Sequence, residues 1–583
     1  MLKLTKYLKR FRKEVIIGPM FKLTEAIFEL IVPLVMAKMI DVGIGEKDVS
    51  YVLKMGGIMV LLGVVGLICA LVCQYCAARA SQGFGTVLRS EMFSHIMRLS
   101  HTEIDHLSTP DLITNITNDV NQLQLGVAML IRLLIRAPFL VVGATVMALA
   151  LDWKLACIFL AACPLVGLVL YLIMSRCIPF YRLIQKKLDR ISLITRENLS
   201  GVRVIRAFSR QEKEKERFAQ ASLDQMNTAV QVGRVSALLN PLTSVIINLA
   251  IAAVLWFGGF RVESGGMTQG EVIAFVNYLN QILIAMIALA NLIVILTRAA
   301  ASAGRVSHVL DTHSSVVNRT RTPAEPKKEE PKISFEHVSF VYPEAGDYAL
   351  NEINFTVEQG QTIGIIGGTG CGKSTLVNLL GRFYETSRGE IKIDGVLLED
   401  YPVPQLRKKV SIVAQKSVLF SGSLRQNMRW RNPKASDQEI WDCLKIAQAD
   451  AFVRELPDKL DTYVAQGGTN FSGGQKQRLS IARALVDSPD ILILDDSASA
   501  LDFATDAALR RSLAEYSAHR ENPVTILIVS QRAATVGGAD QIMVIDDGKL
   551  ADMGTHEELL ERCREYQEIY WSQNEQQKEG QDR

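Results

Sequence analysis

A glycine-rich segment in the second half of the chain has the residue types and spacing of a phosphate-binding loop. Residues 367–374 read GGTGCGKS, which fits the pattern GxxxxGK[ST], and they follow an apolar stretch, 362–366, that predicts a strand. In such loops the glycines let backbone amides surround phosphate, the lysine reaches the β- and γ-phosphates, and the hydroxyl binds magnesium. The candidate nucleotide ligands are Gly367, Gly368, Thr369, Gly370, Cys371, Gly372, Lys373, Ser374 and Thr375.

A second apolar stretch predicts the strand that completes this phosphate site. Residues 491–494 are all apolar, as expected of a strand that is buried on both faces of a sheet. Asp495 follows directly, where its carboxylate can hold magnesium through water beside Ser374. ATP and Mg²⁺ are therefore the expected ligands. Kinases, GTPases and other P-loop ATPases share these two motifs, so the class of enzyme stays open at this point.

A third motif distinguishes among these classes of P-loop enzyme. Residues 471–485 read FSGGQKQRLSIARAL and resemble the signature motif of the ATP-binding cassette (ABC) superfamily. At a predicted helix N-terminus, a serine hydroxyl and glycine amides can meet a γ-phosphate. The resemblance implies that each ATP is clamped between one P-loop and the signature of the opposite subunit. The residues expected to serve that opposite site are Phe471, Ser472, Gly473, Gly474 and Gln475.

The resemblance implies roles for three further positions. Tyr342 would stack on adenine, although a tyrosine near a strand end is as often simple packing. Gln415 would contact magnesium and the attacking water, and residues 498–502 would form the D-loop at the dimer interface. Together with Ser374 and Asp495, Gln415 completes the expected metal site.

Two expected catalytic positions depart from the family. Where a glutamate and a histidine are usual, this chain has Asp496 and Gln531. An aspartate carboxylate lies one methylene, about 1.5 Å, closer to the backbone, and a misplacement of about 1 Å can slow a reaction ~100-fold. Gln531 forms hydrogen bonds but cannot carry a proton. We expect slow hydrolysis at this site, with tolerated substitutions in an active ATPase as the alternative.

An intact signature combined with an altered hydrolytic pair predicts a heterodimer. The signature of this chain would serve the site of a second ABC half-transporter that carries the missing glutamate and histidine. In this respect the chain resembles the degenerate-site subunit of bacterial heterodimeric multidrug exporters. The only change in the signature itself is Phe471, which stands where leucine is commoner.

The elements that must position these residues form an α/β domain over residues 333–583. Apolar runs at 333–335, 361–366, 491–494 and 524–529 predict strands that alternate with helices. A proline- and charge-rich linker, 311–332, precedes this domain.

The first part of the chain, residues 1–310, predicts a membrane domain. Hydrophobic residues make up 49% of the 583 residues, and a span needs ~20 apolar residues in a helix. Six transmembrane helices are predicted, through residues 15–40, 55–78, 137–151, 155–175, 235–260 and 272–297.

The polarity of the loops predicts the orientation of the spans. The basic N-terminus and the long basic segments 79–132 and 176–234 belong in the cytosol by the positive-inside rule. The α/β domain of residues 333–583, here called the cassette, is then cytoplasmic too, and the chain is a multi-pass protein of the plasma membrane. Helical spacing in the long segments predicts helices that continue beyond the bilayer, with breaks at 108–111 and 197–201. By resemblance, the tips near Asp111 and Ser200 would be coupling helices on the cassettes.

The remaining features select among functions. Cys73 and Cys76 form a CxxC inside a span with no second pair, which favours helix packing over zinc. Glu25 and Glu29 share one helical face, either as a cation-attracting surface or in ion pairs with Lys22, Arg132 or Arg136. A net charge of +3 without basic and aromatic clusters gives no reason to expect nucleic acid.

Spans and cassette on one chain fit an exporter better than an importer or a soluble ATPase. The expected function is ATP-driven export of a small hydrophobic or amphipathic substrate, drugs above all. A lipid exporter, a peptide exporter and an ATP-gated regulatory membrane subunit are the alternatives.

Overall fold

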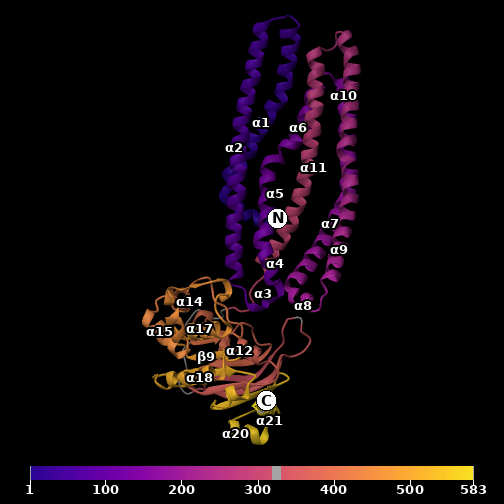
Figure 1. Ribbon diagram of the computed structural model, residues 1–583. Helices are drawn as coiled ribbons and strands as arrows, with labels where there is room; N and C mark the ends of the chain where they lie inside the picture. Colours follow the sequence, from indigo (N-terminus) through magenta and orange to yellow (C-terminus); the bar gives the residue numbers. More distant parts are fainter. Residues whose placement is uncertain (1, 318–329, 344, 582–583) are drawn as a thin grey trace. The chain divides into compact units, whose positions relative to one another are not determined.

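The computed structural model describes residues 2–317, 330–343 and 345–581. The chain forms two compact units, Met1–His95 with Pro110–Asp311, and Ile96–Thr109 with Thr312–Arg583 (Figure 1). Much of the predicted linker, namely 318–329, lies outside the described residues.

The regular elements among the described residues of the first unit are all helices. Its elements are η1 Leu2–Phe11, α1 Arg12–Lys38, η2 Met39–Ile44, α2 Val49–Ile96, α4 Thr109–Thr114, η3 Asn115–Asp119, α5 Val120–Leu133, α6 Arg136–Leu151, α7 Trp153–Ser200, α8 Val202–Ala207, α9 Gln211–Ser236, α10 Leu239–Glu263 and α11 Gln269–Asp311.

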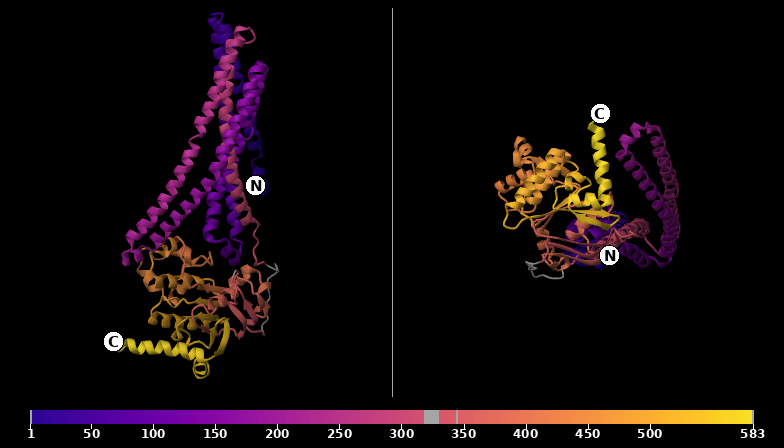
Figure 2. Two further views of the ribbon diagram at one scale, coloured as in Figure 1. Left: turned by 90° about the vertical axis from the view of Figure 1, so that its right-hand side faces the viewer. Right: turned by 90° about the horizontal axis from the view of Figure 1, so that it is seen from below.

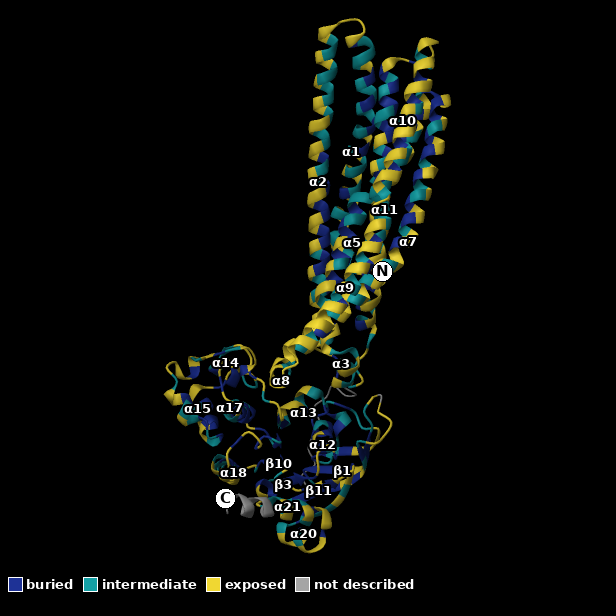
Figure 3. Ribbon diagram, turned by 45° about the vertical axis from the view of Figure 1, so that its right-hand side comes forward, coloured by how far each residue is buried: buried dark blue, intermediate teal, exposed yellow. Residues whose placement is uncertain are grey.

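Five helical segments of this unit are long and apolar enough to cross a membrane. They are Val49–Ile96, Thr109–Leu151, Trp153–Ser200, Gln211–Glu263 and Gln269–Asp311. Each contains one of the predicted apolar runs. Apolar side chains such as Leu53 and Leu61 of α2 are more than half exposed, which suits contact with lipid rather than water. Figure 3 shows long exposed stretches along α2. The remaining predicted span, α1, differs because charged residues interrupt its apolar run.

A proline in α1 creates a polar connection to α11. Pro33 has no N–H, so the carbonyl of Glu29 lacks its usual partner in the helix. The Nε2 atom of Gln281 donates to this carbonyl at 3.0 Å, and the Tyr278 hydroxyl donates to the carbonyl of Leu30 at 2.7 Å. The bond from Gln281 gives the Glu29 carbonyl the donor that Pro33 cannot supply, and the bond from Tyr278 adds a second connection between α1 and α11.

Both predicted breaks in the long helical segments are confirmed. Helix α7 ends at Ser200 with Gly201 as its C-cap, and α8 follows as a short helix. The earlier break lies at Ser108, whose φ of 57° ends helix α3, His101–Leu107. Ser108 and Gly201 are small residues that tolerate the turn.

The second unit contains the predicted α/β domain, built around a six-stranded sheet of order β12-β11-β3-β10-β9-β6. Its strands are parallel except β12, which pairs antiparallel with β11. Every residue of β9 and β10 is buried, in agreement with their continuous apolar sequences. An antiparallel sheet of order β2-β1-β4-β5 and a small β7-β8 pair complete the strands of the described residues.

The strands of this unit are β1 Ile333–Phe340, β2 Leu350–Val357, β3 Thr362–Ile366, β4 Arg388–Ile393, β5 Val396–Leu397, β6 Val410–Val413, β7 Gly422–Ser423, β8 Tyr463–Val464, β9 Ile491–Asp495, β10 Thr525–Val529, β11 Gln541–Asp546 and β12 Lys549–Gly554. Besides α3, its helices are α12 Lys373–Leu380, η4 Leu398–Asp400, α13 Val403–Lys409, α14 Leu424–Met428, α15 Asp437–Ile446, α16 Asp450–Glu455, η5 Lys459–Asp461, η6 Gln466–Gly468, α17 Gly473–Leu485, α18 Phe503–Ala518, α19 Ala533–Val536, α20 His556–Arg562 and α21 Arg564–Gln581.

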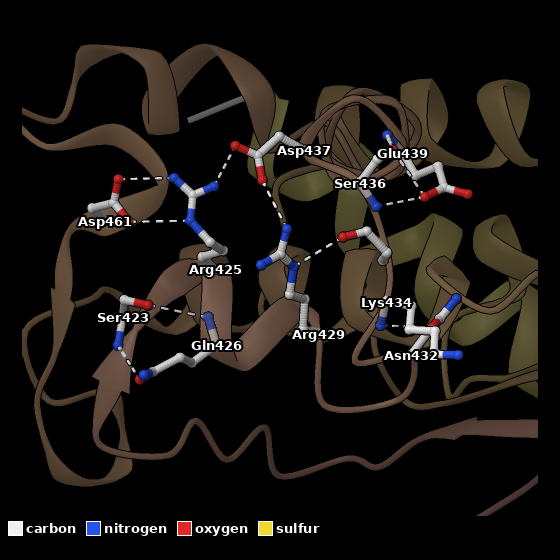
Figure 4. Close-up of polar contacts among 11 residues, drawn as sticks. Ser423, Arg425, Gln426, Arg429, Asn432, Lys434, Ser436, Asp437, Glu439 and Asp461 are labelled. Atoms are coloured by element: carbon white, nitrogen blue, oxygen red, sulfur yellow. Dashed lines mark hydrogen bonds and ion pairs between the residues drawn. The ribbon is translucent and has the colours of Figure 1, made fainter.

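Ion pairs connect the short helices α14, α15 and η5, which precede the signature in the chain. Arg425 of α14 forms ion pairs with Asp437 at the start of α15 and with Asp461 of η5 (Figure 4). These two carboxylates raise the pKa of the Arg425 guanidinium. Ser436 caps α15 reciprocally with Glu439, which fixes where that helix begins. This network joins three short elements around one arginine.

Candidate nucleotide site

The glycine-rich loop connects β3 to α12, as the sequence predicts. Gly372 is the N-cap of α12 with φ of +104°, and a Cβ there would lie 2.6 Å from the carbonyl oxygen of Ala349. A Cβ on Gly367 would lie 2.1 Å from the carbonyl oxygen of Ile545. Side chains are therefore excluded at both positions, and the loop turns tightly into the helix N-terminus.

The lysine of this loop is held by the loop itself. Lys373 is only 8% exposed, and its Nζ atom donates to the carbonyl oxygens of Gly367 at 2.9 Å and Gly368 at 2.6 Å. The Sγ atom of Cys371 lies 3.5 Å from the same Nζ atom. The ammonium group thus lies along the inner edge of the loop, where it can exchange carbonyl partners for phosphate oxygens.

Ser374 and Asp495 meet as predicted. The Ser374 hydroxyl, in the first turn of α12, donates to Oδ1 of Asp495 at the end of β9 at 3.1 Å. Burial raises the pKa of the Asp495 carboxyl, with a smaller contribution from Asp496, while the bond from Ser374 opposes the rise. No group of three or more His, Cys, Asp or Glu side chains with metal-ligand geometry occurs among the described residues. A hydroxyl and one carboxylate nevertheless fit Mg²⁺, which keeps several waters and takes phosphate oxygens.

The residues expected to act in hydrolysis lie together near the end of β9. Gln415 donates from Nε2 to Oδ2 of Asp496 at 3.1 Å. Asp496 has φ of +45°, and its N–H donates to the carbonyl of Val529 in β10 at 3.0 Å. Asp496 and Gln531 line one cavity of about 470 Å³. The carboxylate of Asp496 and the amide of Gln531 therefore share one water-accessible cavity, and Gln415 reaches it through its bond to Asp496.

Tyr342 lies beside the phosphate loop. Its hydroxyl is 3.0 Å from Oγ1 of Thr375, and its ring makes edge contacts with Phe340 and Tyr384 at centroid distances of 4.8 and 5.4 Å. The ring remains half-buried. The ring therefore packs against two aromatic neighbours, and its exposed part still leaves surface on which an adenine could stack.

The signature residues lie at a helix N-terminus, as predicted. Ser472 is the N-cap of α17, and it exchanges hydrogen bonds with Gln475 in a capping box. Gly473 has open space at its Cβ position, whereas a Cβ on Gly474 would lie 3.0 Å from the carbonyl oxygen of Ala500 in the D-loop segment. Phe471 is buried. The hydrogen bonds between Ser472 and Gln475 are exchanged within their own helix end.

Helix α3, which precedes Asp111 in the chain, contacts the cassette. Helix α3 belongs to the same unit as the cassette, whereas Asp111 belongs to the other unit. The Tyr384 hydroxyl donates to Oδ2 of Asp105 at 2.6 Å, and the His101 ring lies 4.6 Å from that of Phe383. Sequence reasoning missed these residues.

A local signal for α3 exists in the sequence. Ser100-His101-Thr102-Glu103 fits the capping box S-x-x-E, and Ser100 and Glu103 do cap the helix reciprocally. Burial lowers the pKa of His101 in this contact. No local signal identifies Tyr384 as its partner, because 279 positions separate it from Asp105.

The two glutamates of α1 form ion pairs. Lys22 contacts Glu25 and Arg136 contacts Glu29, both at 2.7 Å. The ion-pair interpretation is therefore confirmed, and the carboxylates do not form an uncompensated cation-attracting face. They border a cavity of about 340 Å³ between α1 and α2, together with Gly63 and Leu67.

Comparisons with known proteins agree with this architecture. Residues 15–286 match the family described as the ABC transporter transmembrane region, and residues 350–499 match the ABC transporter family. An uncharacterized ABC transporter ATP-binding protein of Mycobacterium tuberculosis is 38% identical over 580 residues, 98% of both chains. An ATP-dependent lipid A-core flippase of Chromobacterium violaceum is 30% identical, covering 97% of this chain and 95% of the flippase.

Two further comparisons extend these findings. A probable multidrug resistance ABC transporter ATP-binding/permease protein of Bacillus subtilis, YheI, is 33% identical and covers 83% of this chain and 82% of its own. The structure of a bacterial Atm1-family ABC exporter with ATP bound has a TM-score of 0.80 at 25% identity, covering 97% of this chain and 98% of its own. The chain belongs to the ABC transporters: it is an exporter half-transporter, a multi-pass membrane protein whose cytoplasmic domain binds ATP and couples ATP hydrolysis to transport.

Proposed function

We propose that this chain is the slowly hydrolysing subunit of a heterodimeric exporter of hydrophobic or amphipathic compounds. One observation carries the proposal. The phosphate-binding residues of the P-loop have the residue types and contacts of a working site, whereas Asp496 and Gln531 replace the glutamate and histidine beside the same site.

Under this proposal the P-loop side binds the nucleotide. Lys373 holds the β- and γ-phosphates, and the loop from Gly367 to Thr375 surrounds them with backbone amides. Ser374, Gln415 and Asp495 hold Mg²⁺, which supplies charge neutralisation on the phosphates when bound. Tyr342 stacks on the adenine. The contact of Ser374 with Asp495 supports the metal assignment.

The hydrolytic side is slow for a geometric reason. Asp496 is basic enough to orient water, but its carboxylate is one methylene shorter than that of glutamate and is also bonded to Gln415. Gln531 is exposed beside Asp496 and cannot hold a positive charge near the γ-phosphate.

A heterodimer follows from this asymmetry. Residues Phe471 to Gln475 present a helix N-terminus to the nucleotide of a partner, and that partner carries the glutamate and histidine. Two copies of this chain would leave both sites slow, which would be a poor arrangement for a pump.

The membrane part has six spans under this proposal, with α1 as the first. Lys22, Glu25 and Glu29 interrupt its apolar sequence, but the pairing of Lys22 with Glu25 and of Glu29 with Arg136 reduces the cost of placing these charges in a bilayer. The five apolar segments supply the other spans.

The names of two relatives support two substrate classes. YheI is named as a probable multidrug resistance transporter, which favours drugs, and the flippase is named for lipid A-core, which favours a lipid as the second candidate. Uptake of a radiolabelled drug and of a fluorescent lipid into inverted vesicles would separate them. Uptake that survives the loss of all hydrolysis would contradict pumping.

The test of the degenerate site is ATP turnover by the purified chain, alone and with its partner half-transporter. We expect slow turnover alone and at least tenfold faster turnover in the pair, because the partner contributes the complete site. Fast turnover by this chain alone would contradict the proposal.

A further inference from the structure

The C-terminal helix α21 contacts the segment that carries Gln531. Tyr566 of this helix is fully buried, and its hydroxyl lies 2.7 Å from Nδ1 of His556. Ile569 packs against the same core, and Gln573 follows four residues later on the same helical face. Figure 2 shows α21 continuing outward beyond the other elements of its unit. The first half of the helix is therefore packed against the core, and Gln573 lies one turn beyond Ile569.

The amide of Gln573 bridges the backbone on both sides of Arg532. Its Nε2 atom donates to the carbonyl of Gln531 at 2.7 Å, and its Oε1 atom accepts from the N–H of Ala533 at 2.9 Å. This pair of bonds imitates a strand partner. From the other direction, the N–H of Arg532 donates to Oγ of Ser530 at 3.0 Å, and Ser530 donates from its N–H to Ile365 of β3. The short segment is thus held from two sides.

We propose that Gln573 is a positioning residue of the nucleotide site, which fixes the backbone of residues 531–533 and so sets the side chain of Gln531 opposite Asp496. Gln573, Gln531 and Asp496 line the same cavity of about 470 Å³. The inference rests on the proposed role of Gln531 at this site. It adds that helix α21 sets the position of Gln531 in the site.

Arg532, between the two residues that Gln573 binds, contacts the D-loop segment and the residue that follows it. The guanidinium of Arg532 lies 5.2 Å from the ring centroid of Phe503 and donates to the carbonyl of Ser499 at 3.5 Å. Because Gln573 holds the residues on both sides of Arg532, a shift of α21 moves Arg532 together with Gln531.

The test uses the full chain reconstituted in nanodiscs, with Gln573→Ala and Gln573→Met as the variants. Methionine keeps the length of the side chain but forms neither hydrogen bond. The matched control is Gln567→Ala in the same helix, which loses one bond to the carbonyl of Leu560 and touches nothing in the site. The readouts are kcat and KM for ATP, and amide hydrogen exchange in a peptide that covers residues 530–534.

We expect kcat to fall about tenfold in both Gln573 variants, because a displaced group of this kind loses rate rather than binding. The KM for ATP should stay within about twofold, since the P-loop is untouched, and exchange at residue 533 should accelerate because its N–H loses its acceptor. Equal kcat in the Gln573 and Gln567 variants would overturn the inference. Fast turnover by the unmodified chain would instead contradict the proposal of a slowly hydrolysing site. The kcat values of the Gln573 and Gln567 variants could still be compared in that case.

Discussion

The two sides of the nucleotide site differ in how firmly their side chains are held. On the P-loop side, Lys373 and Asp495 are buried, and both have hydrogen-bond partners within the loop and the strand ends. On the other side, Gln415 and Gln531 are exposed, and Asp496 meets Gln415 at the surface of a cavity. The family substitutions fall on the exposed side. Under the proposed function, the residues that bind the phosphates are held more firmly than those that act in hydrolysis, and only Gln415 belongs to both groups.

The largest effect should come from the buried side. Lys373→Ala removes the ammonium group that would contact two phosphates, and charge-assisted hydrogen bonds of this kind contribute about 1.5–3 kcal/mol each. We expect the Kd for ATP to rise about 100-fold, measured with a fluorescent ATP analogue on the full chain. Lys434→Ala, an exposed lysine of the same domain, is the control. Similar affinities in the two variants would show that the P-loop lysine does not bind the nucleotide.

A change on the exposed side should alter the rate and leave binding intact. Asp496→Glu moves the carboxylate about 1.5 Å outward, so ATP turnover should rise at least tenfold. Asp496→Asn serves as the control, because an amide cannot act as a base. If the Glu and Asn variants turn over ATP equally, the reach of the carboxylate does not limit this site.

The buried carboxylate should also make stability depend on pH. Burial raises the pKa of Asp495 in the folded state above its ordinary value of 3.8. The folded state therefore binds more protons, so stability falls as pH rises from about 3.8 through the folded pKa, and the penalty is complete above it.

Asp495→Asn removes this penalty. At pH 7 in the absence of nucleotide, the free energy of unfolding of the variant should be higher by on the order of 1 kcal/mol, so the variant should unfold at a higher temperature. This difference should shrink as pH falls toward 4. Scanning fluorimetry across this pH range measures both trends. An advantage that is independent of pH would assign the effect to packing rather than to ionisation.

The smallest effect should come from the hydroxyl of Tyr342. Tyr342→Phe removes the hydroxyl contact with Thr375 and keeps the ring, so ATP affinity should change by less than about threefold. Tyr342→Ala removes the stacking surface and should weaken binding about tenfold. Equal affinities for all three proteins would favour the packing role over the adenine contact.

Much of the site could be predicted because its motifs are local. The loop from Gly367 to Ser374 must turn between a strand and a helix, and the helix begins at Lys373 as the pattern requires. The capping box at Ser472 likewise starts α17 at its predicted place. In both cases the residues that determine the geometry are within a few positions of one another.

Other features depend on residues that are far apart in the sequence. Gln573 reaches Gln531 across 42 positions, and Tyr384 reaches Asp105 across 279. The choice between an ion pair and a cation-attracting face for Glu29 also required the position of Arg136 on another helix. Periodicity reports which face of a helix is apolar, but it does not report which helix lies opposite.

The sequence by itself therefore determined the phosphate loop, the buried strands and the signature helix, because residue type and local spacing control each of them. The family resemblance added that Asp496 and Gln531 depart from the usual residues. The tertiary structure decided which groups meet: Ser374 with Asp495, Gln415 with Asp496, and Gln573 with the backbone around Arg532. These contacts arise from the packing of strand ends and helices that the chain brings together only when its cores form, and pairing at such distances leaves no local pattern.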